Sequence, residues 1–164
     1  MTAPAPARSL TLLSVGIAAL VLLLDQLTKS WAVNELAGGR IIDVVGSLRF
    51  NLTFNSGMAF SQARGAGPIV GVVALGVIVV LLVSLRRTGS VLSAVGIGLV
   101  IGGALGNVAD RVFRAGEGFL GGSVVDFIDV QWWPVFNVAD MAVTVGGALL
   151  VVGSVLAGRE RVSE

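Results

Sequence analysis

Four aspartates lie within a stretch of 31 residues in the C-terminal half of the chain: Asp110, Asp126, Asp129 and Asp140. Two carboxyl groups that meet in a folded protein can share one proton, so that one activates a water molecule while the other protonates a carbonyl oxygen. The chain has no histidine and no cysteine, which excludes disulfides, thiol nucleophiles, Ser-His catalysis and zinc sites of the His-Glu-x-x-His type. A carboxylate pair is therefore the peptide-cleaving machinery that this composition allows.

The local sequence distinguishes two of these carboxyl groups from the others. Asp140 follows the natural N-cap residue Asn137 and takes the third position of a predicted helix, where the helix dipole stabilises a negative charge; capping alone is the plain alternative. Asp126 stands between Val125 and Phe127 with no basic neighbour for several residues. If this segment packs on the rest of the protein, burial raises the pKa of Asp126.

The other two aspartates have simpler explanations. Asp110 directly precedes Arg111 at the end of a predicted helix, so a local ion pair or a cap accounts for it. Asp129 follows Asp126 by three residues and is expected to be wetter, that is, more exposed to solvent than Asp126. From the residues alone, Asp126 with Asp140 offers the two different environments that acid and base roles require.

A second polar cluster, Asp25-Gln26-Leu27-Thr28-Lys29, follows an apolar run near the N-terminus. Asp25 and Lys29 are four residues apart, hence on one face of a helix, with the acid N-terminal to the base, which is the favourable order for an ion pair. A carboxylate paired in this way is a poor proton donor. We therefore expect a structural ion pair, with Lys29 extending outward to the membrane interface.

Long apolar segments must position these clusters. The chain is 55% hydrophobic and 13% charged, against roughly 25% charged residues in an ordinary soluble domain. Uncharged runs of 16, 21, 22 and 18 residues cover 9–24, 65–85, 88–109 and 141–158, and about 18 to 20 apolar residues suffice to span a membrane. The first run reaches that length if it continues through Asp25 and Lys29 to Val33.

The sequence thus predicts an all-α integral membrane protein with a bundle of four transmembrane helices. We expect a single polytopic domain with spans at about 10–33, 66–85, 89–107 and 138–157, and loops at about 34–65 and 108–137. Gly98, Gly102 and Gly106 are spaced by four and predict one closely packed face of the third span. Because the net charge is +1 and no basic patch is visible, we expect no nucleic-acid partner.

Charge density beside the spans predicts the orientation. Both termini and the turn at 86–87 carry basic residues directly at the helix ends, whereas those of the two long loops are diluted. The positive-inside rule therefore places both termini in the cytoplasm and both loops outside. In the first outer loop, 40–45 and 48–54 flank Gly46-Ser47, and the second segment alternates apolar with polar residues, which predicts a small extracytoplasmic β-sheet. Residues 124–130 are again extended or form a short amphipathic piece.

Five segments together resemble the bacterial type II signal peptidases, also called lipoprotein signal peptidases. They occur in the order and topology of that family, and the resemblance covers about residues 15–155. The segments are Asp25-Gln26-Leu27-Thr28-Lys29, Asn55-Ser56-Gly57-Met58-Ala59-Phe60, Gly106-Asn107-Val108-Ala109-Asp110-Arg111, Val124-Val125-Asp126-Phe127-Ile128 and Phe136-Asn137-Val138-Ala139-Asp140.

The resemblance implies a membrane-embedded aspartic endopeptidase of the bacterial cytoplasmic (inner) membrane. Such an enzyme removes the signal peptide of a diacylglyceryl-modified prolipoprotein just before the lipidated cysteine, needs no metal or cofactor, contacts membrane lipid, and is inhibited by the cyclic peptide globomycin. By position, the catalytic pair is Asp126 and Asp140. The positions that line or hold the substrate site are Asn55, Gly57, Asn107, Arg111, Asn137 and Ala139, and those that support the structure are Asp25, Lys29 and Asp110.

Three other classes fit the sequence less well. A small transporter or proton channel would place its acids near the middle of the bilayer, often in repeated halves. A presenilin-like protease would carry a Gly-x-Gly-Asp motif, which is missing here. A non-catalytic scaffold would explain the glycines but not the aspartates. For the protease, we expect the outer sheet to hold the extended peptide by adding main-chain hydrogen bonds.

Overall fold

The computed structural model describes residues 7–57, 67–85, 88–116 and 118–162. These residues form four long helices, each with a stretch long and apolar enough to cross a membrane: α1 (Ala7–Glu35), α2 (Gly67–Leu85), α3 (Val91–Phe113) and α4 (Val138–Val162). Many large apolar side chains on α1, α2 and α4 are exposed, as expected for helices that contact lipid. The prediction of four helices able to span a membrane is confirmed.

α3 lies at the centre of the bundle and contacts the other three helices. A Cβ on Gly102 would lie 2.7 Å from the carbonyl oxygen of Ala18 in α1, and a Cβ on Gly103 would meet the carbonyl oxygen of Ala139 in α4. The glycines one turn before and one turn after Gly102 also face α1, which confirms the predicted glycine face. Residues without a side chain thus let α3 approach two helices at backbone distance.

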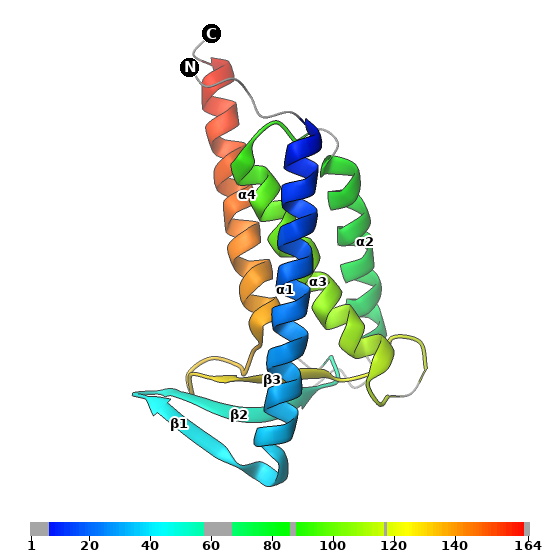
Figure 1. Ribbon diagram of the computed structural model, residues 1–164, viewed down its shortest axis with the longest axis vertical. Helices are drawn as coiled ribbons and strands as arrows, with labels where there is room; N and C mark the ends of the chain where they lie inside the picture. The colour runs from blue at the N-terminus through cyan, green and yellow to red at the C-terminus, as the bar shows by residue number, and fades with distance from the viewer. Residues whose placement is uncertain (1–6, 58–66, 86–87, 117, 163–164) are drawn as a thin grey trace.

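A three-stranded antiparallel sheet lies at one end of the bundle (Figure 1), in the order β1 (Ile41–Val45), β2 (Leu48–Asn55), β3 (Val124–Asp129). The hairpin of β1 and β2 turns at Gly46, whose φ of +56° glycine adopts without strain. This hairpin is the one predicted from the first loop. The sheet is larger than predicted, because β3 comes from the loop between α3 and α4 and pairs Asp126 with Thr53.

An apolar cluster fixes the sheet to the end of α1. Ala32 of α1 and Leu36, the residue directly after α1, pack against Val125 and Phe127 of β3, and all four side chains are buried. Because successive side chains of a strand point to opposite faces, holding Val125 and Phe127 against α1 turns Asp126 to the opposite face. The packing of the sheet therefore decides where this carboxyl group points.

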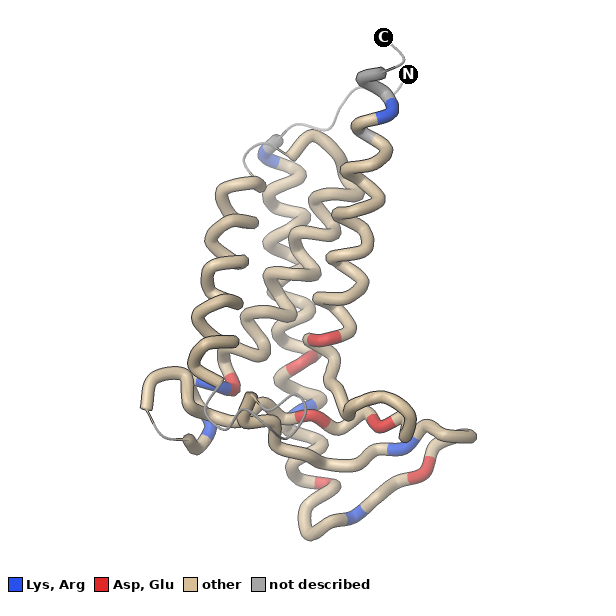
Figure 2. The backbone as a smooth tube through the Cα atoms, turned by 180° about the vertical axis from the view of Figure 1, so that it is seen from behind, with Lys and Arg blue, Asp and Glu red and all other residues tan. Residues whose placement is uncertain are grey.

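The charged residues avoid the middle of the bundle (Figure 2). Among the described residues they gather toward the sheet and at the opposite end, where α1 begins and α4 ends. The acids of the two polar clusters all lie toward the sheet. The chemistry of the chain is therefore concentrated at the sheet end of an otherwise apolar bundle.

Candidate active site

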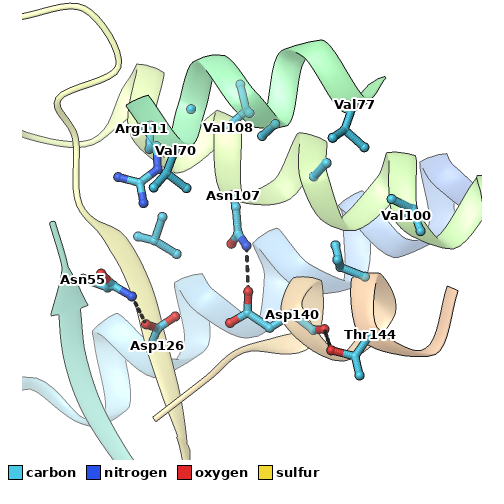
Figure 3. Close-up of a pocket in the computed structure, with 15 residues that line it drawn as sticks. Asn55, Val70, Val77, Val100, Asn107, Val108, Arg111, Asp126, Asp140 and Thr144 are labelled. Carbon is cyan, nitrogen blue, oxygen red and sulfur yellow. Dashed lines mark hydrogen bonds between the residues drawn. The ribbon is translucent and has the colours of Figure 1, made fainter. Parts of the chain in front are cut away.

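Asp126 and Asp140 come from different elements and line one cavity of about 370 Å³, here called the central pocket (Figure 3). Asp126 lies in β3 and Asp140 in the first turn of α4. Asn137 connects them, because its Nδ2 donates to Asp126 Oδ1 at 2.7 Å and its backbone N–H donates to Asp140 Oδ2 at 3.2 Å. One residue thus holds both carboxyl groups.

The position of Asp140 follows from the start of α4. Asn137 Oδ1 accepts a hydrogen bond from the Asp140 N–H at 2.9 Å, while the Asp140 carboxylate reaches back to the Asn137 N–H. This reciprocal capping confirms the helix start expected from the sequence. The remaining oxygen, Asp140 Oδ1, accepts from Asn107 Nδ2 at 2.8 Å. Both carboxylate oxygens of Asp140 are therefore held by N–H donors.

Asp126 is 3% exposed. Burial raises its pKa, the nearby Asp140 raises it further, and together they bring it from the ordinary value of 3.8 to about 6. Hydrogen bonds from Asn55 and Asn137 and the charge of Lys29 oppose this shift. The predicted rise of the pKa is confirmed, so Asp126 is suited to hold a proton close to neutral pH.

Lys29 links the first polar cluster to the site. Its Nζ lies 2.8 Å from Asp25 Oδ2 and 3.0 Å from Asp110 Oδ2, and donates to Asn107 Oδ1 at 2.9 Å. The ion pair with Asp25 is confirmed, but the predicted outward extension of Lys29 is wrong. Its side chain is fully buried, because three acceptors inside the bundle receive its three N–H groups. With Oδ1 of Asn107 engaged by Lys29, the Nδ2 of that amide faces Asp140.

Asp110 joins α3 to α1 and to the sheet. The expected local ion pair of Asp110 is present, but Arg111 is not its partner, because adjacent residues of a helix point in different directions. Asp110 pairs instead with Arg114, one turn later, at 2.8 Å, and with Lys29. Its Oδ2 also accepts the backbone N–H of Val125 at 3.1 Å, so the same carboxylate fixes the start of β3.

The central pocket is polar near the sheet and apolar along the helices. Asn55, Asn107 and Arg111 line its polar end together with the two aspartates, and the rest is lined mainly by valines and alanines of α2, α3 and α4. Arg111 is 6% exposed, and its Nη1 lies 3.5 Å from the carbonyl oxygen of Gly122. Its guanidinium points into the space beside Asn55 and Asp126 (Figure 3).

Three residues that the resemblance assigned to the substrate site do not line this pocket: Gly57, Asn137 and Ala139. The Gly57 N–H donates to Asn55 Oδ1 at 2.9 Å, which turns the Asn55 Nδ2 toward the carboxyl group on β3. Ala139 is fully buried, and its N–H donates to Asp25 Oδ1 at 2.9 Å. These residues act on the pocket through their neighbours. Residues 58–60 of the same motif lie outside the described residues.

Two side chains to which the sequence analysis gave no role belong to this network. Gln26 Nε2 lies within hydrogen-bond distance of Asp25 Oδ2, Asp110 Oδ1 and the Gly106 carbonyl oxygen, at 3.1 to 3.2 Å. Thr144 lines the central pocket one turn after Asp140 and donates its hydroxyl to the carbonyl oxygen of that residue at 2.8 Å. The i, i+4 spacing on one helix face was the available signal for Thr144.

Asp129 is 4% exposed, so the prediction that it is wetter is wrong. The pairing of β2 with β3 places Arg49 opposite Asp129, and Arg49 Nε donates to Asp129 Oδ2 at 2.8 Å. Burial acts to raise the pKa of Asp129, but hydrogen bonds from Arg49, the Gln131 backbone and Asn51 outweigh it and lower the pKa. Asp129 does not line the central pocket. Its carboxylate forms an ion pair with Arg49 that joins β3 to β2.

The edge of the sheet beside Asp126 is already occupied. The Val125 N–H donates to the Asp110 carboxylate, and its carbonyl oxygen accepts from Asn137 Nδ2 at 3.3 Å. The N–H groups of the two residues after Asp126 donate to the Phe136 carbonyl oxygen at 3.0 and 2.8 Å. These groups of β3 are therefore not open to a peptide that adds as a further strand, and the other edge strand, β1, is separated from β3 by β2. That the sheet holds the peptide by main-chain hydrogen bonds stays a prediction.

Comparison with known proteins places this arrangement of residues in a family. The sequence model of the family described as signal peptidase (SPase) II matches residues 17–156. The chain belongs to the signal peptidase II family. It is 48% identical over 151 residues to the lipoprotein signal peptidase of Mycobacterium tuberculosis (strain ATCC 25618 / H37Rv), covering 92% of this chain and 73% of that protein. The corresponding protein of Mycobacterium leprae (strain Br4923) is 46% identical over 151 residues, covering 92% and 74%.

A solved structure supports the same membership. A bacterial membrane enzyme determined by the in meso method at 2.3 Å resolution superimposes with a TM-score of 0.73 at 28% identity, covering 87% of each chain. Signal peptidase II is a protease family, and the four apolar helices make this member a multi-pass membrane protein. The resemblance identified from the five motifs is confirmed. Within the described residues, no group of three or more acidic side chains is arranged to hold a metal ion.

Proposed function

We propose that this signal peptidase II removes the signal peptide of a prolipoprotein with Asp126 and Asp140 as an aspartic catalytic pair. The observation that carries the proposal is the bridge through Asn137, which binds both carboxyl groups at the wall of one pocket. A proton shared between two such carboxyl groups is the basis of peptide hydrolysis by aspartic proteases.

The surroundings of the two residues assign their roles. Asp126 is buried and has a pKa of about 6, so it carries the proton and is the general acid. Asp140 sits at a helix N-terminus, and each of its oxygens accepts an N–H bond, so it is the general base. Asn107 and Asn137 hold this carboxylate toward the pocket.

The reaction then needs one water molecule. Asp140 takes a proton from the water molecule as the water oxygen attacks the scissile carbonyl carbon, and Asp126 gives its proton to the carbonyl oxygen. In the second step the tetrahedral intermediate returns a proton to Asp126, and Asp140 gives its proton to the leaving nitrogen as the C–N bond breaks. The products are the free signal peptide and a mature lipoprotein with a new amino terminus, and both aspartates are restored.

The shape of the pocket fits a lipid-modified substrate. Its apolar length between α2, α3 and α4 suits the signal peptide and acyl chains that stay in the membrane, and cleavage falls just before the diacylglyceryl-modified cysteine. Asn55 and Arg111 lie beside Asp126 (Figure 3), and from there they would bind the peptide backbone near the scissile bond. Globomycin, as an inhibitor of the family, would occupy the same pocket.

The orientation of the chain in the bacterial inner membrane follows from its charges. Arg8 lies in the first turn of α1 and Arg159 near the end of α4, and these two helix ends are opposite the sheet (Figure 1). The positive-inside rule assigns that end to the cytoplasm. Both termini are then cytoplasmic, and the sheet and the catalytic pair stand at the outer face.

Cleavage by purified variants tests the proposal. With a diacylglyceryl-modified prolipoprotein as substrate and a gel shift as readout, Asp126→Asn and Asp140→Asn should each abolish cleavage, and globomycin should block the unmodified enzyme. Asp129→Asn is the matched control, because Asp129 lies on the same strand but pairs with Arg49. Substantial cleavage by either of the first two variants would refute the assignment.

A further inference from the structure

A second cavity is also lined by Asp126. Its volume is about 220 Å³, and we name it the sheet-side pocket; it is lined by Thr53, Phe54, Asn55, Ser56, Asp126, Pro134 and Val135. It shares Asn55 and Asp126 with the central pocket. A peptide bond held against Asp126 therefore has two cavities beside it.

The two cavities differ in chemistry. The central pocket runs between helices that are apolar enough to cross a membrane, whereas the sheet-side pocket lies between the end of β2 and the segment just before α4. Two of its lining side chains, Thr53 and Ser56, carry hydroxyls. Apart from Asp126, no charged side chain lines it in the described part of the chain.

A polypeptide cut at the catalytic pair must extend in both directions from the cut. On its N-terminal side is an apolar signal peptide, which suits the cavity between the helices. On its C-terminal side is a chain that leaves the membrane, which suits the more polar cavity beside the sheet. The N–H groups at the β3 edge are occupied, so this side of the substrate needs a cavity and not a strand pairing.

We propose that the sheet-side pocket binds the first residue or two of the mature lipoprotein, directly after the lipid-modified cysteine. This subsite rests on the proposed function, since it takes its direction from the cut at Asp126 and Asp140. The cavity is small, so its walls set how large the bound side chain can be. Val135, before α4, and Ser56, after β2, each form part of that wall.

A cross between enzyme variants and substrates tests the subsite. Two diacylglyceryl-modified prolipoproteins that differ only in the residue after the cysteine, glycine or leucine, are cleaved by the full-length enzyme and by Val135→Trp. Filling the cavity should lower kcat/KM for the leucine substrate relative to the glycine substrate by about tenfold or more, the range of effect that one or two methylenes have in a pocket. Val45→Trp is the control, because Val45 on β1 is 72% exposed and does not line the pocket.

The possible results distinguish failure of the proposed subsite from failure of the proposed catalytic pair. If Val135→Trp lowers cleavage of both substrates equally, or of neither, the subsite is refuted while the catalytic pair stands. Ser56→Leu repeats the test from an exposed position if Val135→Trp does not fold, with the same expected selectivity. Failure of the unmodified enzyme to cleave either substrate, or cleavage by Asp126→Asn, would overturn the proposed function itself.

Discussion

Replacing Asp126 by asparagine should make the protein more stable at alkaline pH while it removes activity. The ionised carboxylate of Asp126 is held in a buried position that raises its pKa from 3.8 to about 6. A shift of about two units corresponds to about 3 kcal/mol of unfavourable free energy in the folded state. Asparagine has the shape of the carboxyl group but no charge, so this penalty is absent in the variant.

The hydrogen bonds reduce the expected gain. Asp126 accepts one N–H from Asn55 and one from Asn137, and asparagine can accept only one of these with its oxygen. The lost hydrogen bond costs about 1 kcal/mol. At pH 8 the variant should therefore be more stable than the unmodified protein by about 2 kcal/mol.

The sign of the pH dependence follows from the raised pKa. A group whose pKa is higher in the folded protein contributes stability that is complete below its unfolded pKa, near 4, and is lost as the pH rises through about 6. The advantage of Asp126→Asn should hence shrink from pH 8 to pH 5 and reverse near pH 4. A difference that does not change between pH 8 and pH 5 would refute this reasoning.

Tryptophan fluorescence during unfolding by SDS in mixed micelles measures this effect. The indole of Trp31 packs edge-to-face on Phe50 and Phe127, at centroid distances of 5.2 and 6.1 Å, so it reports on the sheet that carries Asp126. Asp129→Asn is the control of opposite sign. Because hydrogen bonds lower the pKa of Asp129, this variant should be less stable than the unmodified protein at pH 8. The difference should close only as the pH falls below about 4, where the unmodified protein loses the contribution of the ionised carboxylate.

Three further changes follow from the same contacts. Lys29→Met leaves the buried carboxylate of Asp25 without its cation and Asp110 with Arg114 alone, so the free energy of unfolding should fall by about 3 to 5 kcal/mol in the same SDS titration. Gly102→Ala places a Cβ 2.7 Å from a carbonyl oxygen of α1 and should cost about 1 to 3 kcal/mol in that titration. Asn55→Ala removes a hydrogen bond that opposes protonation of Asp126, so the alkaline limb of the kcat/KM profile should move above pH 6.

Each change has a matched control in the chain. Arg40→Met breaks an ion pair with Glu35 whose side chains are 60% and 50% exposed, and it should change stability little. Gly16→Ala introduces a Cβ with nothing within 4 Å, so stability should be kept or raised. Asn51→Ala removes a contact to Asp129 and should leave the alkaline limb in place. Equal effects in a variant and its control would contradict the corresponding explanation.

Local spacing was enough to predict several features of the site. Asn137 and Asp140 are three residues apart, and a helix start places such residues in reciprocal contact whatever surrounds them. Asp25 and Lys29 form their ion pair for the same reason, since four residues bring side chains onto one helix face. The absence of charge around Asp126 predicted its raised pKa, because burial of a lone carboxyl group disfavours its charge.

The errors share a cause. Lys29 points inward because Asp110 and Asn107, more than seventy residues away, supply acceptors inside the bundle. Asp129 is buried because the register of β2 on β3 sets Arg49 across from it. The spacing of neighbouring residues predicts neither the rotation of one helix against another nor the register of two strands.

The sequence by itself determined the family, the four apolar helices, the hairpin and the identity of the polar residues, because each depends on residue types or on contacts within one turn or one strand. Only the tertiary structure decided that Asn137 joins Asp126 to Asp140, that Lys29 orients Asn107, and that a second cavity opens beside the sheet. Those features depend on how closely α3 packs against its neighbours and on how β3 is held against α1. The physical reason is that a glycine face and an apolar strand predict that two elements pack closely. Which polar side chains then meet depends on the contacts of the whole fold, which local spacing does not contain.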